Sequence, residues 1–417
     1  MSTVQLGTTS LAFERALNSA LNELDRQRLH DALELAEFSI GLSDPNPRVG
    51  CVIGSPNGAI VGKGFTQRAG EPHAEVMALL EAGQFAKGAT AWVTLEPCAH
   101  FGRTPPCCDA LVAAGIARVV VAIGDPFPHV DGRGIGRLRA AGVTVDMADE
   151  SIASLALQLN IGFFSRVQRG RPWVRLKTAV SMDGRTSLPD GTSQWITGEA
   201  ARHDGHLWRA RAGVILTGIG TMLRDDPQLD VRGIAVASQP MRVVVDSNWR
   251  TPISARLFSK PSPVLVVGAS TMGAAAQELR SVGAQTLMLI GANGQVDLQA
   301  LMQLFAQREI NEVHVEAGPT LNARLIDAGL VDELLMYMAP SLLGAGHGVA
   351  NLEPPGDLGT ASRFRFLDCQ QLGVDLRIRA QVLPRAAIMG TQSVEKIDTC
   401  RSECSIRRSN PLFLNDI

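Results

Sequence analysis

Apolar residues recur at helical spacing near the start of the chain, where Leu29, Leu33, Ala36 and Ile40 would share one face of a helix. Short runs rich in β-branched residues follow: "VGCVIG", "AIVGKGF", "TAWVTL" and "RVVVAIG". Helical patterns lie between the later runs, and "GIGRLRAAGVTVDM" supplies a further helix and strand. Strands that alternate with helices predict a layered α/β domain over residues 25–150, preceded by an extension over residues 1–24.

A second alternation of strands and helices begins near residue 172. Its strand-like runs are "WVRLKTAV", "AGVILTG", "MRVVVDS", "SPVLVVG", "QTLMLIG", "NEVHVEAG" and "DELLMYMAP". The later runs are almost continuously apolar, which is typical of a sheet covered by helices on both faces. We therefore predict a second α/β domain over residues 172–384 and a tail over residues 385–417. The linker over residues 151–171 should contain one helix, at residues 151–164.

Composition and charge narrow the class of protein. The 417 residues are 45% hydrophobic and 19% charged, as in ordinary globular domains. The formal net charge of −2 argues against a general nucleic-acid binder, because such a protein carries an excess of Lys and Arg. We expect no secretory signal and no membrane partner, since no uncharged apolar run approaches the roughly 18 residues of a membrane span. Seven cysteines, a sparse and odd number, indicate a reducing cytoplasm in which thiols bind metals or fill cores.

Two cysteines and a histidine form the first chemical pattern. The stretch "TLEPCAHFGRTPPCCDAL" contains Cys98 and Cys107, and "AGEPHAEVMAL" places His73 at the start of an apolar-striped helix. One imidazole and two thiolates are ligands that suit zinc. A structural zinc normally has four protein ligands, whereas three ligands and a water are typical of a catalytic zinc.

Glu75 favours the catalytic interpretation of this pattern. A carboxylate two residues after a metal ligand, at a helix start, can face the open position and carry a proton to a leaving group. Zinc deaminases combine H-x-E with a later P-C-x-x-C and give the glutamate this role. Here "HAE" matches the first half, but the second cysteine is delayed until Cys107.

Two alternatives stay open for the metal site. Cys108 could replace Cys107 as a ligand, although the Pro-Pro pair before Cys107 favours the latter. A fourth ligand, from Cys108 or His100, would close the site and make it the structural zinc of a binding protein without turnover. In the tail, Cys400 and Cys404 lie four positions apart, but no histidine or further cysteine joins them, so we expect no second metal site there.

The second domain lacks G-x-G-x-x-G, the standard dinucleotide fingerprint. It contains "VEAGPTLNARLIDAGLVDEL", in which a strand ends at Glu316, Gly318 relaxes the turn and Pro319 suits the first position of a helix. Backbone amides at such a helix start can bind an anion. On its own, this pattern is a weak indication of a ligand site.

Several motifs together resemble one enzyme family. "DPNPRVGCVI", "GEPHAEVMAL", "TLEPCAHFGRTPPCCDAL" and "GDPFPHVDGRGI" resemble the deaminase half of the bifunctional riboflavin-biosynthesis deaminase–reductases, in which the long gap between the cysteines is normal. "RLKTAVSMDGRT", "SQWITG", "LTGIGTMLRDDPQLDVR" and "VEAGPTLNARLI" resemble the reductase half. The resemblance covers about Arg26 to Pro384. It implies a cytidine-deaminase-like α/β/α domain followed by a dihydrofolate-reductase-like α/β domain.

For the first domain, the resemblance implies that His73, Cys98 and Cys107 bind one zinc ion per chain and that Glu75 is the catalytic proton carrier. The substrate would be a diaminopyrimidinone that carries a ribosylamino 5′-phosphate. Zinc hydroxide would displace its ring 2-amino group as ammonia. Asn46, in "DPNP", would hydrogen-bond the base.

Three positions depart from the family pattern: Asp44 stands where a histidine often precedes "PNP", Thr66 replaces a histidine, and Phe127 replaces an asparagine. None of them is a metal ligand, so the chemistry should survive, while substrate affinity could change. The alternative is a single-activity enzyme in which these substitutions have silenced the first domain.

For the second domain, the resemblance implies hydride transfer from NADPH to C1′ of the opened ribosylamino sugar, giving a ribitylamino product. Lys177 and Asp225 are the polar groups expected near the reacting carbon. The residues expected to bind the cofactor are Ala179, Trp195, Thr221, Asp225, Ser247, Gly318, Pro319, Thr320, Leu321, Asn322, Ala323 and Arg324. Those expected to bind the substrate are Ser193, Arg209, Leu229, Arg232 and Glu316.

Arg209 and Arg232 also make physical sense as phosphate ligands, since guanidinium groups match phosphate oxygens in geometry and charge. By the same resemblance, the expected partner is a small phosphorylated pyrimidine. A homo-oligomer is also expected.

Overall fold

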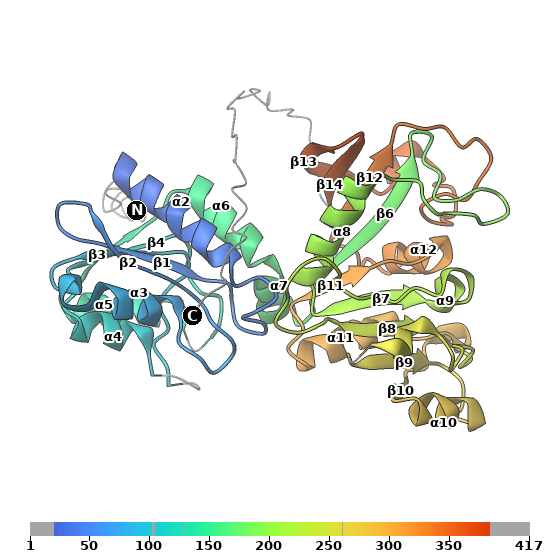
Figure 1. Ribbon diagram of the computed structural model, residues 1–417, viewed down its shortest axis with the longest axis horizontal. Helices are drawn as coiled ribbons and strands as arrows, with labels where there is room; N and C mark the ends of the chain where they lie inside the picture. The colour runs from blue at the N-terminus through green and yellow to red at the C-terminus, as the bar shows by residue number, and fades with distance from the viewer. Residues whose placement is uncertain (1–20, 102–104, 129, 261, 384–417) are drawn as a thin grey trace, which may run out of the picture.

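The computed structural model describes residues 21–101, 105–128, 130–260 and 262–383. The predicted tail, with Cys400 and Cys404, and most of the predicted N-terminal extension lie outside these residues. The described chain forms two α/β bodies, one built on a five-stranded sheet and one on a nine-stranded sheet (Figure 1). Among the described helices, none has the length and apolar character needed to cross a membrane.

The first sheet has the strand order β2-β1-β3-β4-β5. β1 pairs antiparallel with β2 and β3, and β3, β4 and β5 are parallel. The strands are β1 (Gly50–Gly54), β2 (Ile60–Phe65), β3 (Thr90–Val93), β4 (Arg118–Val121) and β5 (Thr144–Met147). The helices are α2 (Glu23–Glu37), α3 (Ala74–Ala82), α4 (Cys107–Ala113), α5 (Arg133–Ala140) and α6 (Glu150–Leu159), and a 3-10 turn lies at Gly83–Ala86.

Helices cover both faces of this sheet. Alternate residues of a strand point to opposite faces, so Val119 and Val121 of β4 pack in the core under α3, α4 and α5, whereas Val120 packs toward α2 and α6. Figure 1 shows α2 and α6 on one side of the strands and α3, α4 and α5 on the other. The apolar runs of the sequence are explained by this two-sided burial.

Glycines allow α3 to lie directly against the edge strand β2. A Cβ added to Gly62 would lie 2.1 Å from the carbonyl oxygen of Ala78, and one added to Gly64 would lie 2.2 Å from that of Ala74. Because both obstacles are backbone atoms, a side chain there would push α3 away from the sheet.

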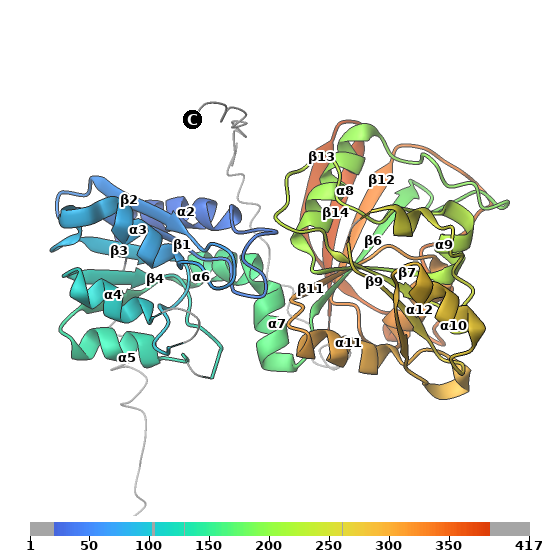
Figure 2. The same cartoon turned by 60° about the horizontal axis from the view of Figure 1, so that its bottom comes forward.

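The linker forms two helices where the sequence predicted one at residues 151–164. α6 ends at Leu159, and α7 (Ile161–Arg169) begins after Asn160. The Asn160 side chain bonds to the backbone N–H and C=O of Arg48, at 2.7 and 2.9 Å. This contact between distant segments explains a break that helical periodicity could not predict. Figure 2 shows α7 between the two sheets.

The second sheet has the order β10-β9-β8-β7-β11-β6-β12-β14-β13. The strands from β10 to β12 in this order are parallel, and β14 and β13 add an antiparallel hairpin. The strands are β6 (Trp173–Ser181), β7 (Val214–Gly218), β8 (Met241–Val245), β9 (Val264–Gly268), β10 (Gln285–Met288), β11 (Glu312–Val315), β12 (Glu333–Ala339), β13 (Phe364–Leu372) and β14 (Asp375–Val382).

The helices of the second domain are α8 (Glu199–Arg211), α9 (Ile219–Asp225), α10 (Ala274–Ser281), α11 (Leu298–Gln307) and α12 (Pro319–Asp327). 3-10 turns lie at Arg256–Ser259, Ala292–Gly294 and Leu358–Thr360. α11 and α12 pack on one face of the parallel strands, and α9 and α10 pack on the other. The α/β fold class predicted from the sequence is therefore confirmed, and β6 to β12 correspond to the seven predicted runs.

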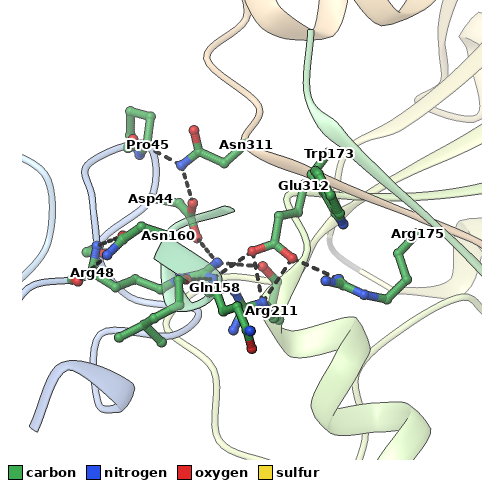
Figure 3. A network of polar contacts seen from close by, with 12 residues as sticks. Asp44, Pro45, Arg48, Gln158, Asn160, Trp173, Arg175, Arg211, Asn311 and Glu312 are labelled. Carbon is green, nitrogen blue, oxygen red and sulfur yellow. Dashed lines mark hydrogen bonds and ion pairs between the residues drawn. The ribbon is translucent and has the colours of Figure 1, made fainter. Parts of the chain in front are cut away.

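A buried ion-pair network joins the two domains (Figure 3). Glu312, at the start of β11, accepts hydrogen bonds from Arg48 of the first domain (2.7 Å), from Arg175 of β6 (2.8 Å) and from Arg211 of α8 (2.9 Å). The Glu312 side chain is 1% exposed. The three guanidinium groups hold the pKa of Glu312 far below its usual range, although burial alone would raise it.

The close packing of β2 and α3 gives a stability prediction. We expect Gly62→Ala to lower the free energy of unfolding by about 1–3 kcal/mol, because the new methyl group meets backbone that must move. Urea denaturation followed by circular dichroism measures the change. Gly136→Ala in α5 is the control, since its Cβ meets nothing within 4 Å; it should be neutral or stabilise by up to about 1 kcal/mol. Equal losses in the two variants would contradict the packing argument.

Candidate functional site

Three candidate metal ligands meet at the edge of the first domain. The Nδ1 atom of His73 lies 3.6 Å from the Sγ atom of Cys98 and 3.3 Å from that of Cys107. The three ligand atoms all lie within 4.8 Å of one another. One imidazole nitrogen and two sulfurs at this spacing fit a tetrahedral zinc ion with one position left for a non-protein ligand.

Two helix starts and one loop position these ligands. His73 is the N-cap of α3, Cys107 is the first residue of α4, and Cys98 lies in the loop that follows β3. The backbone N–H of Cys107 donates to the Cys98 sulfur at 3.3 Å, and that of Cys108 donates to the Cys98 carbonyl at 3.3 Å. Amides at the start of α4 therefore stabilise negative charge on Cys98. These two hydrogen bonds also fix the position of Cys98 relative to Cys107.

Glu75 lies in the first turn of α3 and is 3% exposed. Burial, together with negative charge on Cys98, raises the pKa of its carboxyl to about 7. A buried carboxyl beside the candidate ligands has the position that the sequence predicted for a proton carrier.

The structure separates the two alternative ligands from the cluster. Cys108 is fully buried in the core under α3, α4 and α5, and its sulfur faces Asp109 at 3.8 Å. The His100 ring lies 5.8 Å from the ring of Phe127, centroid to centroid. Within the described residues, the group that could hold a metal consists of His73, Cys98 and Cys107 alone.

Glu96 fixes the loop that carries Cys98, and sequence reasoning missed it. Its carboxylate is 4% exposed and accepts hydrogen bonds from the backbone N–H groups of Asp125, Gly132, Gly134 and Ile135, at 2.9–3.4 Å. The "EPC" sequence was a signal for it, because a carboxylate two residues before a candidate ligand can bind backbone amides elsewhere. Its partners could not be identified without the fold.

Asn46 lies half-buried in the loop between α2 and β1.

The three residues that depart from the family pattern have different surroundings. Thr66 is buried, and its backbone N–H bonds to the Val49 carbonyl at 2.9 Å. Asp44 bonds to Asn311 of the second domain at 2.7 Å, and Phe127 packs beside His100. None of these side chains joins the metal-ligating group.

The second domain contains a cleft of about 1250 Å³. It lies where β7, β8 and β11 end and α9 and α12 begin, which is the usual place for ligands in parallel α/β sheets. The predicted residues that line it are Lys177, Ala179, Ser193, Trp195, Arg209, Thr221, Asp225, Leu229, Arg232, Ser247, Glu316, Gly318, Pro319, Thr320, Leu321 and Arg324.

Two residues of the predicted cofactor-binding run do not line the cleft. Asn322 and Ala323 are 2% and 6% exposed and lie on the buried side of α12. The Nδ2 atom of Asn322 donates to the carbonyl of Val349 at 2.8 Å. A run of consecutive helical residues turns through every direction, so only part of it can face a ligand.

Charged side chains meet in the lining of the cleft. Arg209 binds Glu316 with two hydrogen bonds, of 2.5 and 2.9 Å, and the Nε2 atom of His314 lies 3.3 Å from the same carboxylate. Burial lowers the pKa of Lys177, whose ammonium lies over the Tyr337 ring at 5.7 Å. Burial alone would raise the pKa of Glu316, but Arg209 and Lys177 hold it well below its usual value.

Several residues of the cleft were not predicted from the sequence: Arg202, His206, Arg224, Arg250, Arg256 and Tyr337. Arg202 stacks on the ring of Trp195 at 4.8 Å, and Trp195 is 70% exposed. Tyr337 donates from its hydroxyl to Asp204 at 2.8 Å. Arg224 lies within the "LTGIGTMLRDDPQLDVR" motif, but the other five come from segments with no recognisable motif, and only the fold shows that all six share one cavity.

Comparisons with known proteins agree with this geometry. Residues 22–123 match the family model of the cytidine and deoxycytidylate deaminase zinc-binding region, and residues 172–378 match that of the RibD C-terminal domain. The riboflavin biosynthesis protein RibD of Escherichia coli is 45% identical over 365 residues, which are 84% of this chain and 98% of that protein. The chain belongs to the RibD family.

Solved structures of RibD proteins have the same two-domain fold. Acinetobacter baumannii RibD superposes with a TM-score of 0.79 at 42% identity, over 87% of this chain and 99% of that one. A Thermotoga maritima protein, described as a diaminohydroxyphosphoribosylaminopyrimidine deaminase/5-amino-6-(5-phosphoribosylamino)uracil reductase, gives a TM-score of 0.77 at 28% identity, over 86% and 99%. As a RibD protein, the chain is a bifunctional enzyme of riboflavin biosynthesis with a zinc-binding deaminase domain and a reductase domain. The fold and function implied by the sequence motifs are confirmed.

Proposed function

We propose that the first domain deaminates a diaminopyrimidinone that carries a ribosylamino 5′-phosphate, and that the second domain reduces the ribosyl group of the product to ribityl. The observation that carries the proposal is the three-ligand cluster with Glu75 buried beside it, in one chain with a cleft lined by Lys177 and Glu316. The Thermotoga maritima relative, described by the same two activities, supports the choice of substrate.

In the first domain, His73, Cys98 and Cys107 would hold one zinc ion. Zinc, when bound, lowers the pKa of a coordinated water toward about 7. Glu75 accepts a proton from the attacking water and passes it to the ring amino group, which leaves as ammonia. Asn46 hydrogen-bonds the pyrimidine and orients it for attack.

In the second domain, the cleft would hold NADPH and the deaminated substrate side by side. The nicotinamide supplies the hydride. The start of α12, from Gly318, offers backbone amides to the cofactor's phosphates. Ser247 and Arg250 follow β8 in the cleft lining, where a guanidinium suits the extra phosphate that distinguishes NADPH from NADH. Lys177, whose buried ammonium is attracted by the carboxylate of Glu316, donates a proton to the oxygen released when the sugar ring opens.

Of the two arginines proposed for the substrate phosphate, Arg232 has the better placement. The Arg209 guanidinium already binds Glu316 through two nitrogens, so Arg209 orients the carboxylate and offers less to a phosphate. Arg232 pairs with Asp230 at 2.5 Å but is half-exposed at the cleft.

The cytoplasmic location, the homo-oligomer and the domain limits inferred from the sequence stay predictions.

Glu75→Gln tests the proton carrier. We expect the variant to keep its zinc but to lose deamination by about 10²–10⁴-fold, since an amide cannot accept the proton. Ammonia release measures deamination, and NADPH consumption on pre-formed deaminated substrate measures reduction. Reduction should persist at the wild-type rate; equal loss of both activities would contradict two separate sites.

Adjacent cysteines provide a matched test of the ligand set. Cys107→Ala should lose zinc and deamination, because only two protein ligands remain. Cys108→Ala should keep one zinc per chain and lose only the stability expected of a small buried cavity, about 1–2 kcal/mol. Metal analysis of the dialysed proteins measures the difference. Zinc loss from Cys108→Ala would show that the ligand was assigned to the wrong residue.

Arg232→Ala tests phosphate binding. We expect the reductase KM for the phosphorylated substrate to rise about tenfold or more, because a charged hydrogen bond to phosphate is lost. The KM for a dephosphorylated analogue should not change. Arg250→Ala is the control: it should raise the KM for NADPH and leave that for the substrate unchanged. The same rise for both substrates in Arg232→Ala would reject Arg232 as the phosphate ligand.

A further inference from the structure

The loop between α2 and β1, residues 38–49, carries Asn46 and lies against the second domain. Gly41 in this loop has a φ of +71°, and a Cβ added there would lie 2.9 Å from the carbonyl oxygen of Ala210 in α8. The loop therefore approaches the backbone of the second domain too closely for a side chain at this point.

Asn311 holds the loop on one side of Asn46. Its Nδ2 atom donates to the Oδ1 atom of Asp44 at 2.7 Å and to the carbonyl of Pro45 at 3.1 Å (Figure 3). The amide is itself oriented by Arg166 of α7, which donates to its Oδ1 atom at 2.7 Å and also to the Pro45 carbonyl at 3.2 Å. Asn311 is 5% exposed, so these hydrogen bonds do not compete with bulk water.

Arg48 holds the loop on the other side of Asn46. Its guanidinium donates to Glu312 at 2.7 Å and to the carbonyl of Arg211 at 2.8 Å. The side chain of Asn160 fixes the Arg48 backbone through both its N–H and its C=O. Both flanks of Asn46 are thus held by residues of the linker and of the second domain.

The loop also contacts the segment that leads to the candidate metal ligands. The Ser39 hydroxyl donates to the carbonyl of Thr66 at 2.9 Å, and the backbone N–H of Thr66 donates to Val49 at 2.9 Å. One residue further on, the backbone N–H of Gln67 donates to Pro72, directly before His73. A displacement of the loop would change the distance between Asn46 and the metal site.

We propose that Asn311, a residue of the reductase domain, is a positioning residue of the deaminase: through Asp44 and Pro45 it sets where Asn46 meets the pyrimidine. The inference rests on the proposed role of Asn46 in substrate binding. A displacement of about 1 Å in a positioning group can cost as much as about 100-fold in rate.

A charge exchange tests the pair in the full-length enzyme. Asn311→Asp places a second carboxylate beside that of Asp44, so the two repel and the loop moves. We expect deaminase kcat/KM to fall about tenfold or more, mainly through KM, with zinc content unchanged and reductase kcat/KM within about twofold of wild type. In the double variant, which adds Asp44→Asn, an amide at position 44 faces a carboxylate at position 311. The contact again has one hydrogen-bond donor and one acceptor. The added substitution should return deaminase kcat/KM to within about threefold of wild type.

Two further variants complete the test: Arg169→Ala is the control, and Asn311→Ala is a neutral alternative to Asn311→Asp. Arg169→Ala breaks an ion pair between α7 and Asp332 but touches no residue of the loop, and it should leave deamination unchanged. Asn311→Ala removes both donors without adding a charge, and it replaces Asn311→Asp in the test if the latter does not fold. It should raise the deaminase KM severalfold.

Asn46→Ala separates the two hypotheses. If Asn46→Ala raises the deaminase KM and neither Asn311 variant does, the positioning role of Asn311 is overturned and the proposed function stands. If Asn46→Ala has no effect on the KM, the substrate-binding role of Asn46 fails, and the inference fails with it. A loss in Asn311→Asp that Asp44→Asn does not recover would also overturn the positioning role.

Discussion

The carboxylate of Glu312 is the contact on which the relation between the two domains depends. It is almost fully buried among three guanidinium groups, from the first domain, from β6 and from α8. A buried ion-pair cluster of this kind adds little net stability, but removal of one partner leaves an unpaired buried charge and costs several kcal/mol. The cluster therefore specifies one arrangement of the domains. Glu312 also begins β11, the strand that leads to Glu316 in the cleft, so one short strand serves both the interface and the reductase site.

The two sites are assembled by different devices. In the deaminase domain, helix starts bring ligands together: His73 caps α3, Cys107 opens α4, and Glu96 ties the Cys98 loop to the start of α5. In the reductase domain, the carboxyl ends of parallel strands surround a cleft, and charged side chains in its lining orient one another. Converging helix starts suit a small metal site, whereas a cleft at the ends of parallel strands suits a long dinucleotide beside a second ligand.

The sequence predicted the features that are encoded locally. Apolar runs predicted β6 to β12, and the motifs singled out His73, Cys98 and Cys107, which the structure brings together. The sequence did not predict the β13–β14 hairpin, whose residues are mostly exposed in β13 and half-buried in β14 and lack the continuous apolar character of the other strands. Nor did it predict the roles of Glu96, Asn160 and Glu312, because each depends on partners far away in the chain. Pattern and motif describe neighbours along the chain, whereas these three contacts depend on how the elements pack.

The strand order of the second sheet has a consequence for synthesis. β1, β2 and β3 are close in the sequence, so the first sheet can begin to form while the rest of the chain is still on the ribosome. β6 must wait, because its neighbours in the sheet, β11 and β12, are made much later. Arg48 of the first domain waits even longer for its partner, because Glu312 lies 264 residues further along the chain. The deaminase loop is therefore expected to reach its final form only after β11 of the reductase domain has been synthesised.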